Sequence, residues 1–485
     1  IRLHGAGIFP DSVYYISVAR NIANGSGFVG YDGYYYVLQP PLYPVLLGAI
    51  KILLNTDPLI SSGYVNAVLF GLTIYLAGLF FLKYLKSYTL VLLGTVSILI
   101  SFVFIQIALT ALSEPLFILL VLLFIYFLEK YYVKPDITSL IIFSTAASLA
   151  CLTRYIGIVL ILTGVISILI QNNRLFKEKI RRIAIFLFIS CLPIGLWIIR
   201  NISLSGTFSG QRADSSYTLS ENIKFLVNTI LKWYLQIQIT GLQVIIISII
   251  IAALLVLLIK RHKQKSLADI NKLSPTLIFI LLYTLLLIIS STTTAYDYIA
   301  NRLLSPIYLP VFLISFFIID NILIWLSKYY RPKVLTAFFA AGLIAWMIYP
   351  AAKTVYIIND YVKLSGFGFN SSSWDNLETI NYLNKNKELG TDYMVYSNVP
   401  EAVYILSDIK ARWSPAKTLY NSPLTVNNES NLKYIFGRNN NICLVWFYKM
   451  DRNFLYSIDE LQKNLNFEKI ADFKDGSIYI LRKVN

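Results

Sequence analysis

Residues 10–44 read PDSVYYISVARNIANGSGFVGYDGYYYVLQPPLYP and form a polar segment near the front of a chain that is otherwise mostly apolar. A helix is predicted from Asp11 onward, because apolar residues recur there at steps of three and four. These apolar residues are Val13, Tyr14, Ile16, Val18, Ile22 and Ala23. Polar side chains fall mainly on the other faces, so we expect this helix to lie on a membrane surface.

The same segment carries signals for the end of this helix and the start of another. Asn24, Gly25 and Gly27 are predicted to end the first helix, since asparagine and glycine are typical of helix C-termini. A tyrosine-rich loop follows. Pro40 and Pro41 then predict the start of a second short helix, because proline is tolerated in a first helical turn but not deeper.

Composition indicates a polytopic membrane protein. Of 485 residues, 56% are hydrophobic and only 14% are charged, which is more apolar sequence than one soluble core contains. The net charge of +16 does not indicate a nucleic-acid partner, because the basic residues stand in short clusters between apolar runs. Three cysteines are too few for a disulfide framework, and two histidines without a Cys/His cluster make a zinc site improbable.

Ten apolar runs are long enough to cross a bilayer, at about 20 residues each with some shorter. They lie near residues 59–82, 88–107, 115–128, 137–153, 156–170, 183–199, 241–259, 275–290, 303–327 and 334–350. Lysine and arginine gather in every second loop between these runs, and the positive-inside rule predicts that those loops are cytoplasmic. The parts of the chain predicted to lie outside are the Asp11 loop, the segment with Glu114, the loops 200–238 and 291–302, and the C-terminus.

No ionisable residue stands near the middle of any of the ten runs. Ion-coupled carriers and proton relays need charges there, so a secondary transporter is disfavoured. The ionisable residues that touch the runs cluster at their predicted outer ends: Glu114 in LSEPLF, Arg154 in LTRYIG, Arg200 in IIRN and Arg302 in YIANRLLSPIYLP. We therefore expect them to converge on the same face as Asp11.

An Asp before an amphipathic helix, then Gly25-Ser26-Gly27-Phe28 and then PPLYP, resembles the first external loop of the GT-C glycosyltransferases. The resemblance is strongest to the branch of protein O-mannosyltransferases and lipid A aminoarabinose transferases, and it extends over roughly the first 350 residues. It implies an enzyme that takes a sugar from a polyprenyl phosphate and passes it to an acceptor outside the membrane. It also implies a membrane helix before the Asp11 loop, which we expect to be missing from this sequence.

The chemistry that the resemblance implies assigns roles to these residues. The lipid phosphate that leaves the sugar carries negative charge and needs a cationic partner. Arginine suits this role because its planar guanidinium offers a fork of hydrogen-bond donors. The acceptor needs a base within hydrogen-bond reach. Asp11 is the candidate base, Glu114 a second candidate catalytic residue, and Arg302 with Arg154 the candidate clamp for phosphate or sugar. Structural roles are open for each: a helix cap for Asp11, a helix-dipole contact for Glu114, and headgroup anchors for the arginines.

Three further residues are candidate substrate contacts. Tyr15 and Tyr155 can stack on or hydrogen-bond to a sugar, although interfacial tyrosines also form aromatic belts. Gln39 stands where many relatives of the resembled family carry a lysine before the PPL motif. The family's second acidic residue is also missing, because Ser12 follows Asp11. No cofactor is assigned with certainty; a divalent cation near Asp11, Glu114 and Asp297 is conceivable, but scattered carboxylates are a weak signal.

Residues 351–485 are polar enough for a soluble α/β domain, which the topology places outside the membrane. Ser373 is predicted to cap a helix that ends at Gly390. DYMVYSN and ICLVWF read as strands and PEAVYILS as a short helix. Ser457 and Glu460 form a capping box, and Asp475-Gly476 marks a hairpin. Acceptor recognition, covering of the site and simple structural support are all open as the role of this domain.

The sequence therefore predicts an α-helical polytopic membrane protein of GT-C type with a small extracytoplasmic α/β domain. Residues 1–350 form the membrane domain, with 1–58 as its first external loop, and residues 351–485 form the second domain. The predicted activity is transfer of a sugar from a polyprenyl-phosphate donor to a protein, lipid or glycan acceptor, with inversion. The alternatives are an oligosaccharide or polymer ligase and a non-catalytic flippase for lipid-linked sugars; membrane lipid is a partner and nucleic acid is not.

Overall fold

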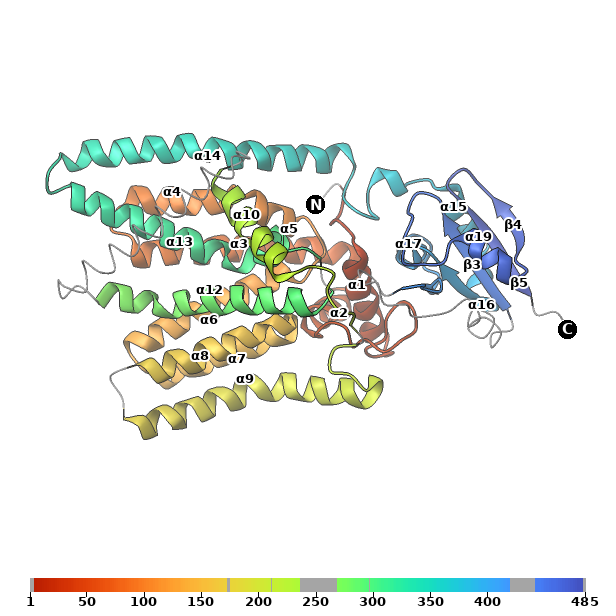
Figure 1. Cartoon of the computed structure of the whole chain (residues 1–485), viewed down its shortest axis with the longest axis horizontal. Helices are drawn as coiled ribbons and strands as arrows, with labels where there is room; N and C mark the ends of the chain where they lie inside the picture. The colour runs from red at the N-terminus through yellow and green to blue at the C-terminus, as the bar shows by residue number, and fades with distance from the viewer. Residues whose placement is uncertain are drawn as a thin grey trace.

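The structure is a computed structural model that describes residues 4–171, 175–210, 212–235, 268–295, 297–418 and 441–482. Most of the helices run roughly side by side in one bundle, and a small sheet lies beyond one end of that bundle (Figure 1). The short helix α1 (Pro10–Ala23) lies between the bundle and the sheet. The chain therefore has a helical part and an α/β part that meet around α1.

The helical part begins with the two predicted short helices and continues through a series of long ones. After α1 come α2 (Leu42–Leu54), α3 (Pro58–Tyr84), α4 (Tyr88–Leu99), α5 (Phe102–Ala108), α6 (Glu114–Val133), α7 (Ile137–Thr153), the 3-10 turn η1 (Tyr155–Gly157), α8 (Ile158–Ile170), α9 (Phe176–Ser205), α10 (Leu219–Tyr234), α12 (Ala268–Thr293), α13 (Asn301–Leu326) and α14 (Pro332–Lys363). The predicted runs 59–82 and 137–153 are confirmed almost to the residue as α3 and α7.

Six helices of the described residues are long and apolar enough to cross a membrane, by length and composition: α3, α6, α9, α12 over Leu273–Thr293, α13 and α14. The predicted run 88–107 is two helices, α4 and α5, bent by 44° at a short break, and counting this pair makes seven. The break has a local cause, because the Ser101 hydroxyl accepts from the Phe104 amide and caps α5. The runs 137–153 and 156–170 form shorter apolar helices, and the run 241–259 lies outside the described residues.

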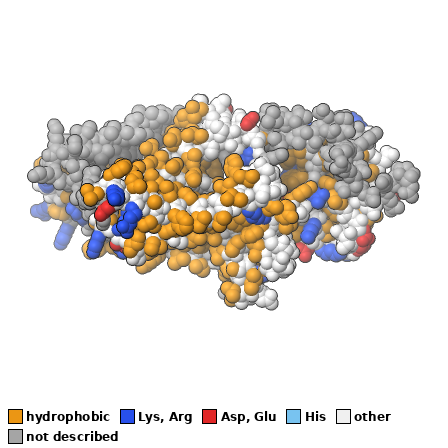
Figure 2. Space-filling model, turned by 90° about the horizontal axis from the view of Figure 1, so that it is seen from below, with side chains coloured by type: hydrophobic (Ala, Val, Ile, Leu, Met, Phe, Trp, Pro, Cys, Tyr) orange, Lys and Arg blue, Asp and Glu red, His pale blue; other side chains and the backbone are white. Residues whose placement is uncertain are grey.

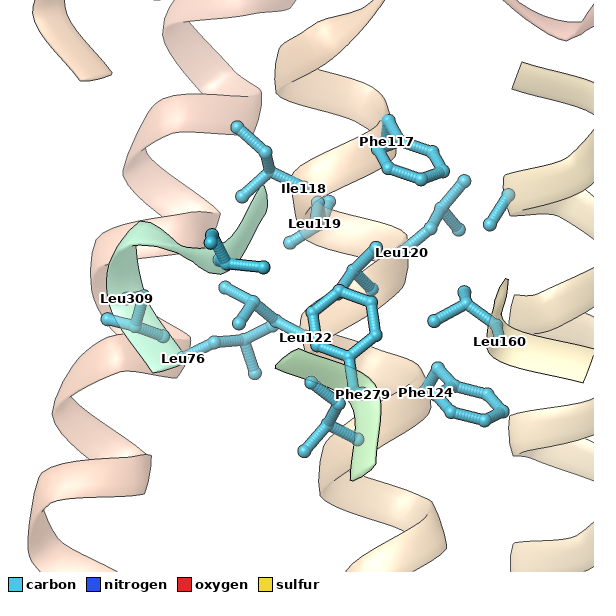
Figure 3. Close-up of a cluster of buried hydrophobic side chains, with 14 of the residues drawn as sticks. Leu76, Phe117, Ile118, Leu119, Leu120, Leu122, Phe124, Leu160, Phe279 and Leu309 are labelled. Carbon is cyan, nitrogen blue, oxygen red and sulfur yellow. The ribbon is translucent and has the colours of Figure 1, made fainter. Parts of the chain in front are cut away.

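The bundle has a buried centre and an apolar outside. In their most apolar stretches, 61% of α6 is buried, but only 17% of α9 and 11% of α14. Figure 3 shows Phe117, Leu120 and Phe124 of α6 among side chains from neighbouring helices. Figure 2 shows a broad hydrophobic surface across the molecule, with Lys and Arg side chains gathered at its left end. Such a surface is stable in lipid rather than in water, so the chain is an integral membrane protein.

The amphipathic helix α1 is buried within the protein, contrary to the prediction that it lies on a membrane surface. Val13 and Ile16 are fully buried in the core of the α/β part, while Val18 and Ala19 are buried in the core of the bundle. Arg20 fixes the far end of the helix, because its guanidinium donates to both carboxylate oxygens of Asp57 at 2.9 Å. An apolar stripe has the same sequence pattern whether it faces lipid or another part of the protein. The pattern therefore predicted a helix correctly but could not predict that α1 packs against protein instead of lipid.

Two buried carboxylates lie at the other end of the bundle, contrary to the prediction that the ionisable residues of the spans cluster at their outer ends. Glu129 on α6 is fully buried and pairs with Lys83 at 2.9 Å. Asp320 lies within the predicted run 303–327, and its carboxylate accepts from the backbone amides of Lys86 and Ser87 at 2.8 and 3.2 Å. Both carboxylates therefore fasten helices to one another rather than form a path through the membrane.

The α/β part is built on one sheet with strand order β2-β1-β3-β5-β4. Its elements are η2 (Ser372–Trp374), α15 (Glu378–Lys385), α16 (Leu389–Asp392), β1 (Met394–Ser397), α17 (Pro400–Ser407), β2 (Ala411–Trp413), β3 (Asn441–Phe447), α19 (Ile458–Asn464), β4 (Glu468–Asp472) and β5 (Gly476–Arg482). Strands β2, β1 and β3 are parallel, and β5 pairs antiparallel with β3 and β4. The predicted strands, the helix PEAVYILS, the Ser457–Glu460 capping box and the final hairpin are confirmed.

Several details differ from the prediction. The helix that was predicted to end at Gly390 ends at Lys385, Gly390 lies in the separate short helix α16, and strand β2 was not predicted. Helix α15 starts at Glu378 instead of being capped by Ser373, because the carboxylate of Asp475 accepts from the Thr379 amide at 3.2 Å. The cap thus comes from the hairpin turn, far away in sequence. In addition, α14 continues through Pro350 to Lys363, beyond the position where the composition changes.

Candidate active site

A cavity of about 1530 Å³ lies where the bundle, the first loop and the α/β part meet. From the helical part it is lined by Asp11, Tyr15, Gln39, Arg154, Tyr155, Asp297 and Arg302, and from the α/β part by Glu401, Trp413, Asp451, Arg452 and Phe454, among others. Six of the seven residues predicted for the site therefore line one cavity. The seventh, Glu114, lies behind the two arginines.

Arg302, in the first turn of α13, is at the centre of the charged groups. Its guanidinium lies 3.0 Å from the Asp11 carboxylate, 3.1 Å from that of Asp297 and 3.7 Å from that of Glu114. The three carboxylates fix the guanidinium in place. About one-third (33%) of the Arg302 side chain is exposed, so the group is also open to the cavity. The three acids are far apart in the sequence, at positions 11, 114 and 297, and the fold brings them to one guanidinium.

Glu114 is the first residue of α6, and its side chain is buried. One carboxylate oxygen lies 2.5 Å from Nη1 of Arg154, yet neither oxygen has a hydrogen bond of good geometry with the described residues. The contact between Glu114 and Arg154 is an ion pair. A buried carboxylate between Arg154 and Arg302 holds both cations in place by charge.

Asp11 is the second residue of α1 and not its cap. Phe9 occupies the N-cap position, and its backbone amide donates to the hydroxyl of Ser12 at 3.1 Å. The cap role considered for Asp11 is therefore wrong. Its two carboxylate oxygens accept instead from Arg302 at 3.0 Å and from the side-chain amide of Gln39 at 3.0 Å. With 40% of its side chain exposed, Asp11 remains reachable from the cavity.

The two tyrosines have different surroundings. Tyr15 is buried, its hydroxyl lies 3.2 Å from that of Ser113, and burial raises the pKa of the phenol above its ordinary value. Tyr15 therefore stays neutral, and it lines the cavity together with Asp11. The Tyr155 hydroxyl donates to the Val37 carbonyl at 3.1 Å and accepts from Asn201 and Trp197 at 3.2 and 3.3 Å. Its hydroxyl is thus used to hold the tyrosine-rich loop.

Two other arginines hold the same loop. Arg200 donates to the Tyr36 carbonyl at 2.9 Å and lies over the ring of Trp197 at 4.5 Å. Arg212 donates to the Leu38 carbonyl at 2.9 Å. These contacts position Gln39, and through it Asp11.

A metal site does not fit this arrangement. Among the described residues, no group of three His, Cys, Asp or Glu side chains is placed to hold a metal ion. Asp11, Glu114 and Asp297, named from the sequence as conceivable cation ligands, surround the guanidinium of Arg302 instead. The positive charge that balances them is supplied by the protein.

Sequence reasoning missed the contribution of the α/β part. Glu401 is buried and lies 3.3 Å from Arg452, whose guanidinium stacks 4.1 Å above the ring of Trp413. Trp413 ends β2, a strand that was not predicted. The one available signal was that polar residues, Asp451 and Arg452, follow the buried strand ICLVWF, but nothing local shows that they face a membrane domain.

Neither a protein-family model nor a curated protein sequence matches the chain. Solved structures do match it. The chain is similar to ArnT from Cupriavidus metallidurans in the apo state, a GT-C aminoarabinose transferase, with a TM-score of 0.60 and 10% identity, covering 98% of this chain and 94% of that chain. For the same protein bound to undecaprenyl phosphate the TM-score is 0.59 at 11% identity, covering 99% and 94%.

The chain is also similar to the oligosaccharyltransferase AglB from Archaeoglobus fulgidus in complex with an inhibitory peptide and a dolichol-phosphate. The TM-score is 0.54 at 10% identity, covering 91% of this chain and 66% of that chain. At these identities the likeness concerns architecture: the chain has the GT-C fold, with a helical membrane part followed by a smaller domain.

Proposed function

Since the chain has the GT-C fold, we propose that it is a membrane glycosyltransferase that moves a sugar from a polyprenyl-phosphate donor to an acceptor on the extracytoplasmic side. The observation that carries the proposal is the contact of Asp11 with Arg302 at 3.0 Å in a cavity that Arg154 also lines. A carboxylate base and arginines for a phosphate are the groups this transfer needs. ArnT was solved with undecaprenyl phosphate and AglB with a dolichol-phosphate, which supports the donor class.

In the proposed reaction the acceptor oxygen or nitrogen forms a bond to the anomeric carbon of the sugar. The bond between that carbon and the phosphate oxygen breaks, and its electron pair leaves with the polyprenyl phosphate. The acceptor proton passes to the carboxylate of Asp11. Attack opposite the leaving group inverts the anomeric centre. Arg302 and Arg154 stabilise the negative charge that grows on the phosphate as the bond breaks.

Donor binding and base activation are linked in this proposal. Without donor, Arg302 is shared among three carboxylates. A phosphate can accept two parallel hydrogen bonds from the planar guanidinium, as a carboxylate can, and so competes with Asp11 for its donors. When phosphate takes the Arg302 donors, the oxygen of Asp11 that faced Arg302 is released for the acceptor, while Gln39 holds the other oxygen at 3.0 Å.

Glu114 acts through the arginines rather than on the substrate. Its buried carboxylate lies 2.5 Å from Arg154 and 3.7 Å from Arg302 and does not line the cavity. We assign it a positioning role. Tyr15 lines the cavity together with Asp11, and Tyr155 positions the loop that carries Gln39.

The extracytoplasmic placement rests on charge. The ends of the helices opposite the cavity carry Lys83, Lys130, Lys179, Arg181 and Lys333, among other basic residues. Such loops face the cytoplasm in membrane proteins. The cavity and the α/β part then face outward.

The test is transfer from defined donors by the full chain in liposomes. The panel contains polyprenyl-phosphate monosaccharides and one lipid-linked oligosaccharide, and the readout is release of free polyprenyl phosphate. Release from a monosaccharide donor supports the proposal, and release only from the oligosaccharide donor supports the ligase alternative. Movement of the lipid-linked sugar between leaflets with no release from any donor contradicts an enzyme and supports the flippase.

A further inference from the structure

The two walls of the cavity differ in the chain segments that supply them. Arg154 follows α7 and Arg302 lies in the first turn of α13, so the phosphate partners belong to the membrane bundle. Trp413, Arg452 and Glu401 belong to the α/β part. Asp11 lies on α1, between the two parts (Figure 1). If the donor phosphate lies at the arginines, attack from the opposite side brings the acceptor in along the wall that the α/β part forms.

That wall is one edge of the sheet. Trp413 is the last residue of β2, Arg452 follows β3, and Glu401 is in the first turn of α17, directly after β1. Strands β2, β1 and β3 are parallel, so their carboxyl ends meet at the same edge. Crevices at the carboxyl ends of parallel strands are the usual ligand sites of such sheets.

The side chains at this edge are held in place before any ligand arrives. Arg452 donates through both Nη nitrogens to Glu401 at 3.3 to 3.5 Å, and its plane lies 4.1 Å over Trp413. Its Nε–H has no hydrogen bond with a residue that the structure describes. Glu401 is 1% exposed, so the ion pair is set into the wall. The exposed side chains of Asp451 and Asn453 line the cavity beside it.

The chemistry of these groups favours a neutral ligand rich in hydroxyls. Glu401 pairs with the guanidinium of Arg452, and Asp451 adds a second carboxylate to the lining of the cavity, so an anion is not favoured at this edge. Planar polar side chains offer paired donors and acceptors to neighbouring hydroxyls. Trp413 and Phe454, with ring centroids 5.8 Å apart, supply the apolar surface for the C–H face of a sugar ring.

We infer that the carboxyl edge of strands β1 to β3, with Arg452, Trp413, Asp451 and Asn453, is a binding subsite for a neutral saccharide. That this saccharide is the acceptor of the transfer rests on the function proposed above. The binding itself does not.

The test uses the labelled full chain in lipid nanodiscs on an array of neutral oligosaccharides of two to four units. The best-bound saccharide is then titrated in solution. Arg452→Lys keeps the charge beside Glu401 but loses the planar fork of donors. We expect the affinity of this variant for the saccharide to fall at least about tenfold, which corresponds to the loss of one hydrogen-bonded contact. Asp451→Asn, at an exposed position, is expected to weaken binding in the same direction. Arg412→Lys is the matched control, because it makes the same change at a neighbouring position outside the subsite. Arg412 precedes Trp413, donates a hydrogen bond to the Asp32 carbonyl at 3.2 Å and does not line the cavity.

Loss of binding in the Arg452 and Asp451 variants, with the Arg412 variant within about twofold of wild type, supports the subsite. Binding of no saccharide, or equal binding by wild type and Arg452→Lys, overturns it. The two proposals fail separately. Saccharide binding that depends on Arg452 without any release of polyprenyl phosphate leaves the subsite standing and removes the transferase. Transfer with an acceptor KM that Arg452→Lys does not change removes the subsite and leaves the transferase.

Discussion

The carboxylate of Asp11 lies 3.0 Å from the guanidinium of Arg302, although the two residues are 291 positions apart in the chain. The contact joins the first loop to the start of α13 across the mouth of the cavity. Both side chains are partly exposed, at 40% and 33%. Because the pair is half-buried and lines the cavity, a phosphate that enters the cavity can reach the guanidinium in place of the carboxylate.

Arg302→Lys tests the phosphate role. Lysine keeps the charge but offers a single point instead of a planar fork, so it cannot serve a phosphate and orient Asp11 in the same way. We expect the donor KM to rise and kcat/KM to fall about 10- to 100-fold, measured as release of polyprenyl phosphate. Arg331→Lys, at an exposed arginine before α14, serves as control. An unchanged donor KM in Arg302→Lys would contradict the phosphate role.

Asn66→Asp tests the support under the site. The fully buried amide of Asn66 donates to the Thr110 carbonyl at 2.5 Å and accepts from the Tyr43 hydroxyl at 3.2 Å. In Asn66→Asp, a carboxylate oxygen would face the Thr110 carbonyl, and neither of these two acceptors would have a donor. We expect a loss of about 1 to 3 kcal/mol, read as a lower melting midpoint in detergent. The exposed Asn381→Asp should melt like wild type; equal midpoints for both variants would refute the buried contact.

The sequence predicted those parts of the structure that depend on local pattern. Helix α7 was predicted with its observed bounds because its apolar run is flanked directly by two charged residues, Asp136 and Arg154, which mark its ends in the sequence. The Ser457–Glu460 capping box was found for the same reason. The residues of the site were chosen from positions at span ends and from resemblance, and six of the seven line the cavity.

What could not be predicted depends on contacts between distant segments. Nothing near Asp320 shows that its carboxylate accepts from the backbone amides of Lys86 and Ser87, just before α4. Nothing near Asp475 shows that it caps α15. Arg452 belongs to the site only because α1 packs between the bundle and the sheet. A stripe of apolar residues also does not distinguish lipid from protein, and for this reason α1 was given the wrong environment.

Lys83 and Glu129 allow a test of the buried pair at the other end of the bundle. Glu129 is fully buried, 2.9 Å from Lys83, and accepts from the Thr276 hydroxyl at 2.6 Å. Lys83→Met leaves this carboxylate without its cation and should cost about 3 to 5 kcal/mol, whereas adding Glu129→Gln removes the charge and should recover most of that loss. Melting midpoints of both variants measure this. A double variant no more stable than Lys83→Met would show that the carboxylate is not the cause.

Glu401 predicts a pH dependence of stability. Burial raises the pKa of this carboxyl from 4.5 to about 6, while Arg452 lowers it. The folded state therefore binds the proton more tightly than the unfolded state, so the contribution of Glu401 to stability is greatest below pH 4.5 and falls as the pH rises to about 6. At about 1.4 kcal/mol per pKa unit, the fall is about 2 kcal/mol.

The measurement compares melting midpoints of wild type and Glu401→Gln between pH 4 and pH 7. Because other groups titrate in both proteins, the difference between the two isolates Glu401. Wild type should lose stability relative to the variant as the pH rises through this window. A difference that is flat, or that changes in the opposite direction, would contradict the raised pKa.

The most direct test of the central proposal is sugar transfer by Asp11→Asn. Asparagine keeps the size of the side chain and its contact with Gln39 but cannot accept the acceptor proton. Ser12→Ala is the matched control, because Ser12 is the residue next to Asp11. Its hydroxyl accepts a hydrogen bond from the Phe9 backbone amide at 3.1 Å and so helps to cap the start of α1. Its loss should cost stability of about 1 kcal/mol and leave the chemistry intact.

The measurement is the single-turnover rate of polyprenyl phosphate release in liposomes, with donor and acceptor saturating and folding checked by melting midpoint. We expect Asp11→Asn to lower this rate by about 100-fold or more, and Ser12→Ala to release product at the rate of wild type. Transfer by Asp11→Asn at the wild-type rate would show that Asp11 is a structural partner of Arg302 and not the base.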